Sequence, residues 1–497
     1  MPSTKNKKIS QVFGRIGANC DPSRCGICPN THRCVGGDGV KPNKLMFIGE
    51  APGREEDWGG RPFIGRAGDE FNNHYLGLAG LDRDDIYITN TMKCRPTDQN
   101  KKPSTGQVLG CSSYHIPGEL DEVEPDVVVL MGATACSMVP DIDLELEHGI
   151  PRYGELFGRE GLVVPMFHPA AGMHDPSKMI PLMEDFKRLG KWLQGDWVAP
   201  SPVIKPDYRL YNASSDVMLG LMLSMQDSWA RLGIIGIDTE THGGEPWSLQ
   251  FSIMPGRARM IRVPDTRAAQ VFRRIEGDKE GPVGVIRRYF MNLAAKGTEF
   301  YFHNADQDLD MLHRIGIDVP EKLVQDTMKE AYHTGRLPQK LKHLGYRLLG
   351  ERMRSWEDVV TGPSKEYLGK WIADAERVAG ELLVEAKIKK LKKSQRWEYK
   401  KHPMEGDFRR IQRHLMTETY KPWEQLETVK ARYPEEWELV AYHVGEMPKL
   451  GIDNAPIDEA VHYGCQDADV TLRVAVEMRN VRRQIVDEIN VAECDWD

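Results

Sequence analysis

Two groups of side chains in this sequence have the types and the spacing for chemistry. The first is a set of thiols, because Cys25 and Cys28 form a C-x-x-C pair and Cys94 and Cys111 follow far downstream. Four thiolates can hold a [4Fe–4S] cluster or a structural Zn²⁺ ion, and the spacing alone does not choose between them. Two more cysteines of the same region are competing ligands, namely Cys20 and Cys34.

The second group consists of carboxylates. Asp238 and Glu240 lie two residues apart at the end of an apolar run, so on a strand both point to the same side. Asp308 lies in the segment HNADQD, whereas Tyr463 and Asp467 are four residues apart and share a helix face. Four carboxylates can hold two Mg²⁺ or Mn²⁺ ions, which activate water and stabilise a leaving oxygen. Each acidic segment taken alone would be a solvated surface.

A third set of residues follows the ends of predicted strands. An apolar strand at 45–48 ends in the tight loop GEAPG at 49–53, and a second glycine-rich turn carries Phe63. Asn90 and His168 each end a further predicted strand. The carboxyl ends of parallel strands share one edge of a sheet, and open α/β folds bind ligands there. The alternative for the loop alone is an ordinary strand-to-helix turn.

Composition narrows the class of protein. The 497 residues suffice for two to four domains, and an apolar content of 40% supports buried cores. Because the net charge is −8, any nucleic-acid site must be a local basic patch. We expect no membrane partner, no secretory signal and a reducing compartment, which together predict a cytoplasmic protein of a bacterial cell or a phage-infected host.

The elements that position these residues are predicted to form two α/β domains. In the first, strands alternate with helices, which favours a parallel sheet with helices on both faces. A proline-containing segment, DWVAPSPVIKP, separates it from the second. Strands are predicted at 45–48, 86–89, 126–131 and 162–167, and then at 232–237, 249–253 and 299–302.

The predicted organisation has four parts. A flexible basic arm at 1–19 precedes a domain at 20–195, a linker at 196–207 and a second domain at 208–497. The second domain contains a helical insertion at about 355–455. Within it, the basic helical segment 387–401 is either a solvated face or a contact to the DNA backbone.

The motifs of the first domain resemble those of family 4 uracil-DNA glycosylases. GEAPG, RPFIGRAG at 61–68, ITNTMKCRP at 88–96 and FHPAAGM at 167–173 occur in the family's order, and the resemblance covers about 20–195. It implies a parallel-sheet glycosylase fold and favours an iron–sulfur cluster over zinc. The ligands that it implies are Cys25, Cys28, Cys94 and Cys111.

The same resemblance implies a pocket for a uracil flipped out of DNA. Phe63 would stack on the base, Asn90 would bind O4 and N3–H, and His168 would donate to O2 as negative charge develops. Glu50 and Asp57 are the carboxylates near this loop, and Glu50 is assigned to orient water. The loop lacks the aspartate that the best-studied uracil glycosylases use there to activate water, as family 4 does. Loop residues expected to support the base with their backbone are Gly49, Ala51 and Gly53.

The acidic segments resemble the 3′–5′ exonuclease family with Asp-Glu-Asp-Asp ligands and a tyrosine, and most of all the proofreading domain of family A DNA polymerases. GIDTET and YGCQDADVTL carry this resemblance over about 208–497, and it implies a ribonuclease H-like domain. Tyr463 would orient the attacking water and Asn304 would contact substrate. Asp306 and Gln307 depart from the family, which commonly has a basic residue and an aromatic there. The implied metal ligands are Asp238, Glu240, Asp308 and Asp467.

Two main hypotheses follow. In the first, one enzyme of DNA repair and replication combines uracil excision with metal-dependent 3′–5′ exonuclease activity on 3′ ends. In the second, the glycosylase-like half is an inactive DNA-binding module, and the exonuclease proofreads for a separate DNA polymerase subunit. A scaffold with two inactive sites is a third interpretation. We expect no polymerase palm domain in this sequence, so that any polymerase would be a separate polypeptide. Similar arrangements occur in phage replication proteins, and a viral origin is therefore a further expectation.

Overall fold

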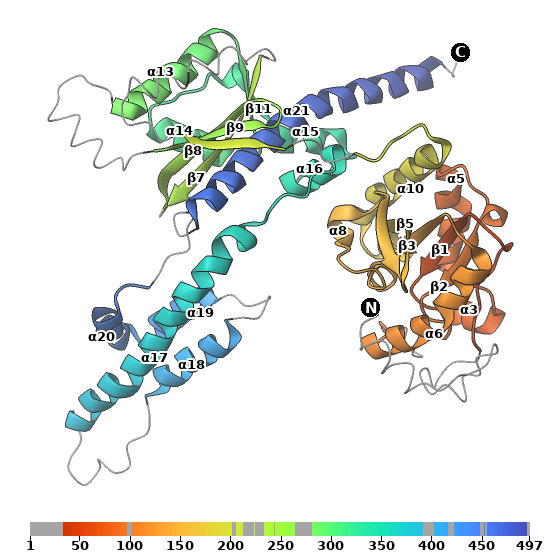
Figure 1. Cartoon of the computed structure of the whole chain (residues 1–497), viewed down its shortest axis with the longest axis horizontal. Helices are drawn as coiled ribbons and strands as arrows, with labels where there is room; N and C mark the ends of the chain where they lie inside the picture. The colour runs from red at the N-terminus through yellow and green to blue at the C-terminus, as the bar shows by residue number, and fades with distance from the viewer. Residues whose placement is uncertain are drawn as a thin grey trace. The chain divides into compact units, whose positions relative to one another are not determined.

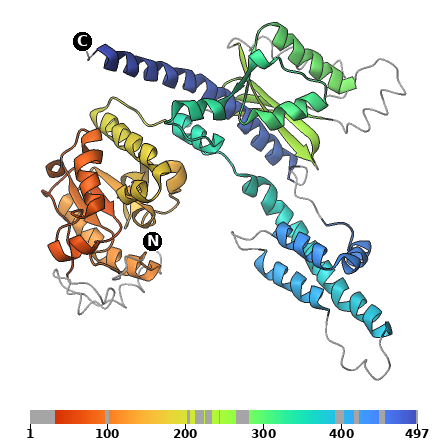
Figure 2. The same cartoon turned by 180° about the vertical axis from the view of Figure 1, so that it is seen from behind.

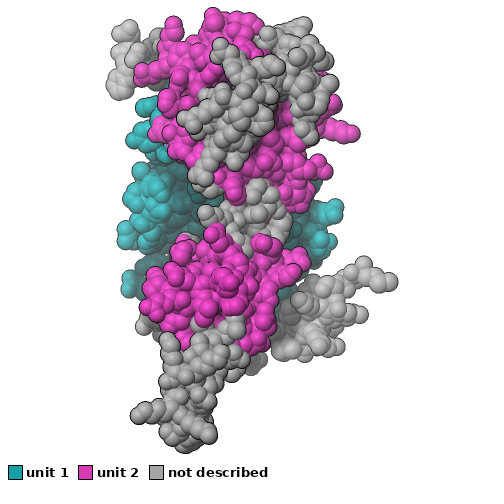
Figure 3. Space-filling model, turned by 90° about the vertical axis from the view of Figure 1, so that its left-hand side faces the viewer, with its two compact units in different colours: residues 1–203, 328–352, 481–497 teal, residues 204–327, 353–480 magenta. Residues whose placement is uncertain are grey.

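The computed structural model of the chain divides into two compact units, which are described separately (Figures 1 and 2). Unit 1 comprises 1–203, 328–352 and 481–497, and unit 2 comprises 204–327 and 353–480 (Figure 3). The structure describes residues 33–96, 102–200, 205–211, 223, 233–242, 244–263, 281–390, 402–415, 422–447, 452 and 455–494. Predicted features outside these ranges are the arm 1–19, Cys20, Cys25, Cys28 and most of the basic segment 387–401.

The sheet of unit 1 has five strands in the order β2-β1-β3-β5-β4. The first four are parallel, as predicted, whereas β4 pairs antiparallel with β5 at the edge and was not predicted. Their bounds are β1 (Leu45–Gly49), β2 (Tyr87–Asn90), β3 (Val127–Met131), β4 (Arg152–Leu156) and β5 (Arg159–Met166).

Helices cover both faces of this sheet because side chains of the buried strands alternate between two cores. Leu45 and Phe47 of β1 pack with the helical segment 66–78 and with α10 (Met179–Gln194). Met46 and Ile48 pack on the opposite side against α6 (Thr105–Val123). The remaining helices of the unit are α3 (Arg54–Gly59), η2 (Arg83–Asp85), α7 (Ala133–Cys136), α8 (Leu144–Glu147), α9 (Pro169–His174), η3 (Pro176–Lys178), α15 (Thr327–Thr334), which starts at the last residue of unit 2, and α16 (Leu341–Leu349).

The sheet of unit 2 has six strands in the order β11-β10-β7-β8-β9-β6. The strands β7, β8 and β9 form an antiparallel meander, whereas β10 and β11 continue from β7 as parallel strands and β6 pairs parallel with β9. The predicted α/β fold class is therefore confirmed for both units. The bounds are β6 (Asp207–Tyr211), β7 (Ile234–His242), β8 (Glu245–Met254), β9 (Arg257–Arg262), β10 (Glu299–Phe302) and β11 (Val324–Asp326).

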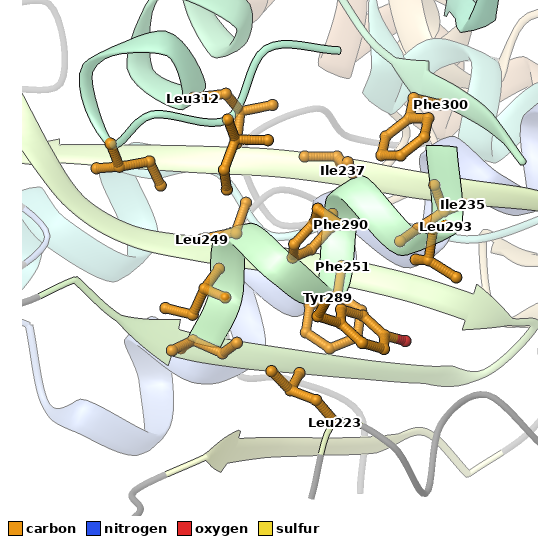
Figure 4. Packing of buried hydrophobic residues seen from close by; sticks show 14 of the residues in the cluster. Leu223, Ile235, Ile237, Leu249, Phe251, Tyr289, Phe290, Leu293, Phe300 and Leu312 are labelled. Atoms are coloured by element: carbon orange, nitrogen blue, oxygen red, sulfur yellow. The ribbon is translucent and has the colours of Figure 1, made fainter. Parts of the chain in front are cut away.

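One face of the second sheet carries an apolar core under α13 (Gly281–Ala295) and α14 (Ala305–Arg314). Figure 4 shows Phe290 of α13 lying over Ile237 and Phe251 of the sheet. The long helix α21 (Ile457–Cys494) covers the other face. A Cβ atom at Gly236 would lie 2.3 Å from the carbonyl oxygen of Ala468, so this glycine allows α21 to lie directly on β7.

Four of the described helices between β11 and α21, namely α17 to α20, pack around a separate apolar core. The ring centroids of Trp371 and Trp437 lie 5.5 Å apart, and those of Phe408 and Trp437 lie 6.0 Å apart. The helices are α17 (Gly362–Lys390), α18 (Pro403–His414), α19 (Pro422–Arg432) and α20 (Pro434–Val444), with the short turns η4 (Glu321–Leu323) and η5 (Glu357–Thr361) before them. Among all described helices, none combines the length and the hydropathy that a membrane span requires.

Candidate active sites

A cavity of about 250 Å³ opens at the carboxyl ends of β1 and β2 in unit 1. This is the sheet edge at which the sequence predicts a ligand. Gly49 lies beneath Asn90 and Phe63 and is not among the lining residues. The predicted residues that line the cavity are Glu50, Ala51, Gly53, Phe63, Asn90 and His168.

Close packing around Gly49 sets the floor of this cavity. Gly49 and Asn90 are partners in the parallel register of β1 and β2. A Cβ atom at residue 49 would lie 2.5 Å from Asn90 Oδ1 and 2.6 Å from Phe63 Cζ, distances that real Cβ contacts do not show. Gly49 therefore allows the amide and the aromatic ring to stand side by side at the strand ends.

Phe63 is held in a backbone conformation that bulky residues rarely adopt, with φ of +57°. Its carbonyl oxygen accepts a hydrogen bond of 3.0 Å from Asn72 Nδ2, and Gly68 provides the space for that carbonyl. The ring centroid lies 5.6 Å from that of His168. Strained backbone that surrounding contacts hold in place is common where a side chain must point into a site.

The carboxylate of Glu56 fixes the turn after Phe63. Its Oε1 accepts the backbone N–H groups of Ile64 at 3.1 Å and Gly65 at 2.9 Å, and the side chain is buried. Sequence patterns alone predict no role for Glu56. The available signal was an acidic residue close behind a tight loop, which can satisfy amides of a neighbouring turn.

His168 presents a defined hydrogen-bonding face. Its Nδ1 accepts the backbone N–H of Ala170 at 3.2 Å as it caps α9, so the proton is assigned to Nε2. Burial lowers the pKa of the imidazole to about 4, and the ring is therefore neutral at pH 7. Gly132 leaves room for this arrangement, because a Cβ there would lie 3.2 Å from His168 Cβ. The residue can thus donate one hydrogen bond without carrying a charge.

Two further polar residues, Thr134 and Lys93, hold the Glu50 side chain and the Asn90 backbone. Thr134 Oγ1 lies 2.5 Å from Glu50 Oε2 and donates to it. The ammonium of Lys93, which is almost fully buried, donates to the carbonyl of Asn90 at 2.8 Å and pairs with Glu119 Oε2 at 2.7 Å. A buried ion pair at the last residue of β2 fixes the strand end that carries the Asn90 amide.

Three of the described cysteines lie together next to this pocket. Cys94 and Cys111 are buried in one small cluster, with Cys34 packed against it. The Sγ atoms of Cys34 and Cys94 lie 3.9 Å apart, and the backbone N–H of Lys93 lies 3.2 Å from Cys111 Sγ. Clustered thiols with a backbone donor fit the ligand set of an iron–sulfur cluster or of zinc. Cys25 and Cys28 lie outside the described residues, as does Cys20.

The carboxylates of unit 2 influence one another electrostatically. Burial raises the pKa of Asp238 well above its usual value, and the charges of Glu240, Asp467 and Asp308 raise it further. Burial and the same neighbours raise the pKa of Glu240 to about 8. Burial also raises the pKa of Asp308 to about 7, although a hydrogen bond from Thr239 opposes this. Each of the other three predicted ligands therefore lies close enough to Asp238 for its charge to disfavour ionisation of that carboxylate.

A divalent cation fits this donor set. Asp238 Oδ2 is buried without a hydrogen-bond partner, and carboxylates that disfavour each other's ionised form would be neutralised by a bound metal. As they stand, the described residues contain no group of three His, Cys, Asp or Glu side chains arranged to hold a metal ion. Burial and the charge of Asp467 raise the pKa of the Tyr463 hydroxyl, which is hydrogen-bonded to that carboxylate.

Asp326 was missed by sequence reasoning and positions α14. Its two carboxylate oxygens accept the backbone N–H groups of Asn304 and Ala305, both at 3.1 Å, at the start of the helix that carries Asp308. Thr239 Oγ1 donates to Asp308 Oδ1 at 2.7 Å and fixes the carboxylate itself. Asp326 belongs to no motif, and only the tertiary structure brings it to the site, whereas Thr239 lies between Asp238 and Glu240 in the GIDTET segment. Asn304 precedes α14 with φ of +69° and is exposed, as are Asp306 and Gln307.

Comparison with known proteins supports the interpretation of unit 1. The pattern of the Uracil DNA glycosylase superfamily matches residues 37–194. The Type-4 uracil-DNA glycosylase of Saccharolobus solfataricus is 32% identical over 172 residues, which are 33% of this chain and 79% of that protein. The Type-4 uracil-DNA glycosylase of Archaeoglobus fulgidus is 34% identical over 174 residues, which are 34% of this chain and 86% of that protein.

A solved structure is also similar to part of the chain. It is the EXD2 exonuclease domain soaked in Mn and Mg, which is 18% identical and covers 30% of this chain and 72% of its own. The TM-score of 0.20 is too low to support a shared arrangement.

Proposed function

The chain belongs, through its N-terminal part, to the family of type-4 uracil-DNA glycosylases, and we propose that unit 1 removes uracil from DNA. The observation that carries this proposal is the convergence of Phe63, Asn90 and His168 on one cavity at the sheet edge. A glycosylase must hold a base that has left the stack, and this needs a closed pocket with an aromatic face and polar groups for the base edge.

Each of the three side chains suits one part of uracil. The ring of Phe63 offers a stacking surface. The amide of Asn90 provides both a donor and an acceptor, which match O4 and N3–H. His168, neutral and protonated at Nε2, can donate to O2 as negative charge develops on the departing base.

The loop after β1 completes the proposed site. Backbone amides of Gly49, Ala51 and Gly53 would support the base or a water molecule. Glu50, whose carboxylate is held by Thr134, is the group we propose to orient the attacking water. Water attack at the sugar releases the base, and Glu50 would position that water by hydrogen bonding.

We propose a [4Fe–4S] cluster behind the pocket, held by Cys94 and Cys111 together with Cys25 and Cys28. The clustered thiols Cys34, Cys94 and Cys111 support this proposal. The cluster would link residue 94 of the strand-end loop to α6, so its contribution is to the position of the segment that follows Asn90.

Replacing His168 tests the proposed glycosylase activity. We expect His168→Ala to lower the rate of uracil release from single-stranded DNA about 100-fold, because one donor to the developing anion is lost. His174→Ala is the matched control, since His174 is exposed at the end of the same helix α9. Product is measured as strand cleavage at abasic sites. Wild-type protein without product, where a control glycosylase is active, would contradict the proposal.

Visible absorbance tests whether the thiol site holds an iron–sulfur cluster or zinc. The wild-type protein prepared without oxygen is expected to show a broad visible absorbance band, because iron–sulfur clusters absorb there and zinc does not. Cys94→Ser should lose the band, whereas Cys136→Ser should retain it, since Cys136 lies buried in a different core of unit 1. A colourless protein that contains zinc would show that our choice of metal is wrong.

For unit 2 we propose a metal-dependent 3′–5′ exonuclease that acts on DNA. The observation that favours it is that the charges of Glu240, Asp467 and Asp308 act on Asp238, whose Oδ2 is buried without a hydrogen-bond partner. Two Mg²⁺ or Mn²⁺ ions bound there would activate water and stabilise the leaving 3′ oxygen. Tyr463 would hold the attacking water, and Asn304 would contact the strand. A separate DNA polymerase subunit is the partner that such an activity would serve.

The exonuclease proposal depends on the acidic site. Asp238→Ala should reduce Mg²⁺-dependent shortening of a 3′-labelled strand by at least about 1000-fold, because a shared metal ligand is lost. Asp310→Ala is the control, as this exposed residue lies on α14 only two positions from Asp308. Removal of Mg²⁺ by a chelator should have the same effect as Asp238→Ala. If the Asp238→Ala protein digests DNA like the wild type, the assignment of metal ligands is wrong.

A further inference from the structure

A segment far along the chain packs onto the back of the proposed uracil pocket within unit 1. Helix α16 lies against α8, and its buried face carries Leu344, Gly345 and Arg347. The segment lies outside residues 37–194, which carry the family match. Unit 1 therefore contains an element that the matched range does not supply.

The guanidinium of Arg347 completes a buried polar network. Its Nη1 donates to Asp185 Oδ1 at 3.0 Å, and its Nη2 lies 2.7 Å from His148 Nε2. His148 Nδ1 lies 2.6 Å from Asp185 Oδ2. One tautomer satisfies all three contacts, with Nδ1–H donating to Asp185 and Nε2 accepting from Arg347. All three side chains are buried.

The buried carboxylate of Asp185 is stabilised as an anion by its neighbours. Burial by itself raises the pKa of Asp185, but the guanidinium groups of Arg347 and Arg188 and the hydrogen bond from His148 outweigh it and lower the pKa to about 2. The planar guanidinium of Arg347 donates hydrogen bonds to two partners at once, which a lysine ammonium cannot do in the same geometry. Removal of one partner of a buried charged group leaves the others uncompensated.

A second anchor lies beside the first. Glu147, which is fully buried, accepts hydrogen bonds from Arg152 Nη1 at 2.7 Å and from Arg352 Nη2 at 2.6 Å. The hydroxyl of Tyr346 lies 3.4 Å from the same carboxylate. The segment 341–352 is thus attached to the consecutive residues 147 and 148 by a charged group in its middle, Arg347, and another at its end, Arg352.

From His148 the contacts lead to the proposed catalytic histidine. The ring centroids of His148 and Phe167 lie 4.4 Å apart, and Phe167 directly precedes His168. The backbone N–H of Gly149 donates to the carbonyl of Pro165 at 2.7 Å. Residues 148 and 149 therefore contact both the end of β5 and the ring before His168.

We propose that Arg347 is a positioning residue of the uracil pocket, which holds the turn 165–168 in place through His148 and Phe167. This inference rests on the proposed glycosylase function, because the turn matters for catalysis only if His168 acts on uracil. A displaced donor costs transition-state stabilisation without removing the DNA-binding surface, since the donor acts only on the charge of the departing base. The pocket thus depends on a segment that lies more than 140 residues beyond the family match.

The test uses full-length variants. Arg347→Met should lower kcat for uracil release about tenfold with KM for DNA within about twofold of wild type, because a small displacement of a positioned group costs rate rather than binding. Arg347→Lys should give an intermediate kcat, since it keeps the charge and loses the fork. Arg159→Met is the matched control, because this arginine of β5 is exposed and pairs with Asp121, which is also exposed.

Amide hydrogen exchange gives a readout that is independent of activity. Peptides that cover 166–174 should exchange faster in Arg347→Met and Arg347→Lys than in wild type and Arg159→Met, because the N–H groups of Ala170 and Ala171 are bonded to His168. Unchanged exchange and unchanged kcat in Arg347→Met would overturn the inference. If that variant does not fold, Arg347→Lys decides in the same way. If the wild type releases no uracil, the proposed function fails, while the exchange data still test the contact.

Discussion

The proposed uracil pocket of unit 1 depends on the absence of a side chain at Gly49. Gly49 ends β1 beside Asn90, and any Cβ atom there would occupy the space of the Asn90 amide and of the Phe63 ring. Other contacts hold Phe63 and Asn90 in their positions beside this glycine. Glu56 fixes the turn that places Phe63 over the glycine, and the buried Lys93 holds the strand end that carries the amide. The strands β1 and β2 end side by side at the sheet edge. Because the last residue of β1 is a glycine, space for the pocket remains there.

Both candidate sites use burial to set the state of a titratable group, but in opposite directions. In unit 1, burial lowers the pKa of His168 to about 4 and leaves a neutral imidazole that can still donate a hydrogen bond. In unit 2, burial and like charges raise the pKa values of Asp238 and Glu240, so these carboxylates are unfavourable as anions until a cation joins them. The first site therefore suits a neutral base that becomes charged on leaving. The second suits metal ions.

Sequence patterns predicted the elements that local periodicity specifies. The strand at 299–302 has the predicted bounds, and the parallel strands of unit 1 lie within a few residues of theirs. The strand β9, RARMIR, was missed because arginines interrupt its apolar alternation, yet Arg259 is buried where Asp207 pairs with it at 2.9 Å. Glu56, Asp326 and Arg347 were also missed. Their roles arise from contacts with backbone amides or with residues distant in sequence, for which no local pattern exists.

The most direct measurement of the central claim is the release of free uracil from a uracil-containing single strand by the full chain and by its Gly49→Val variant. A substitution at Gly68 would not test the same contact, because Gly68 makes room for the Phe63 carbonyl rather than for the Asn90 amide. The account predicts that wild type releases the base. It also predicts that the valine variant, whose side chain fills the space beside Asn90, releases it at least about 100 times more slowly. Release by Gly49→Val at the wild-type rate would contradict the account, since the proposed pocket could not then hold the base.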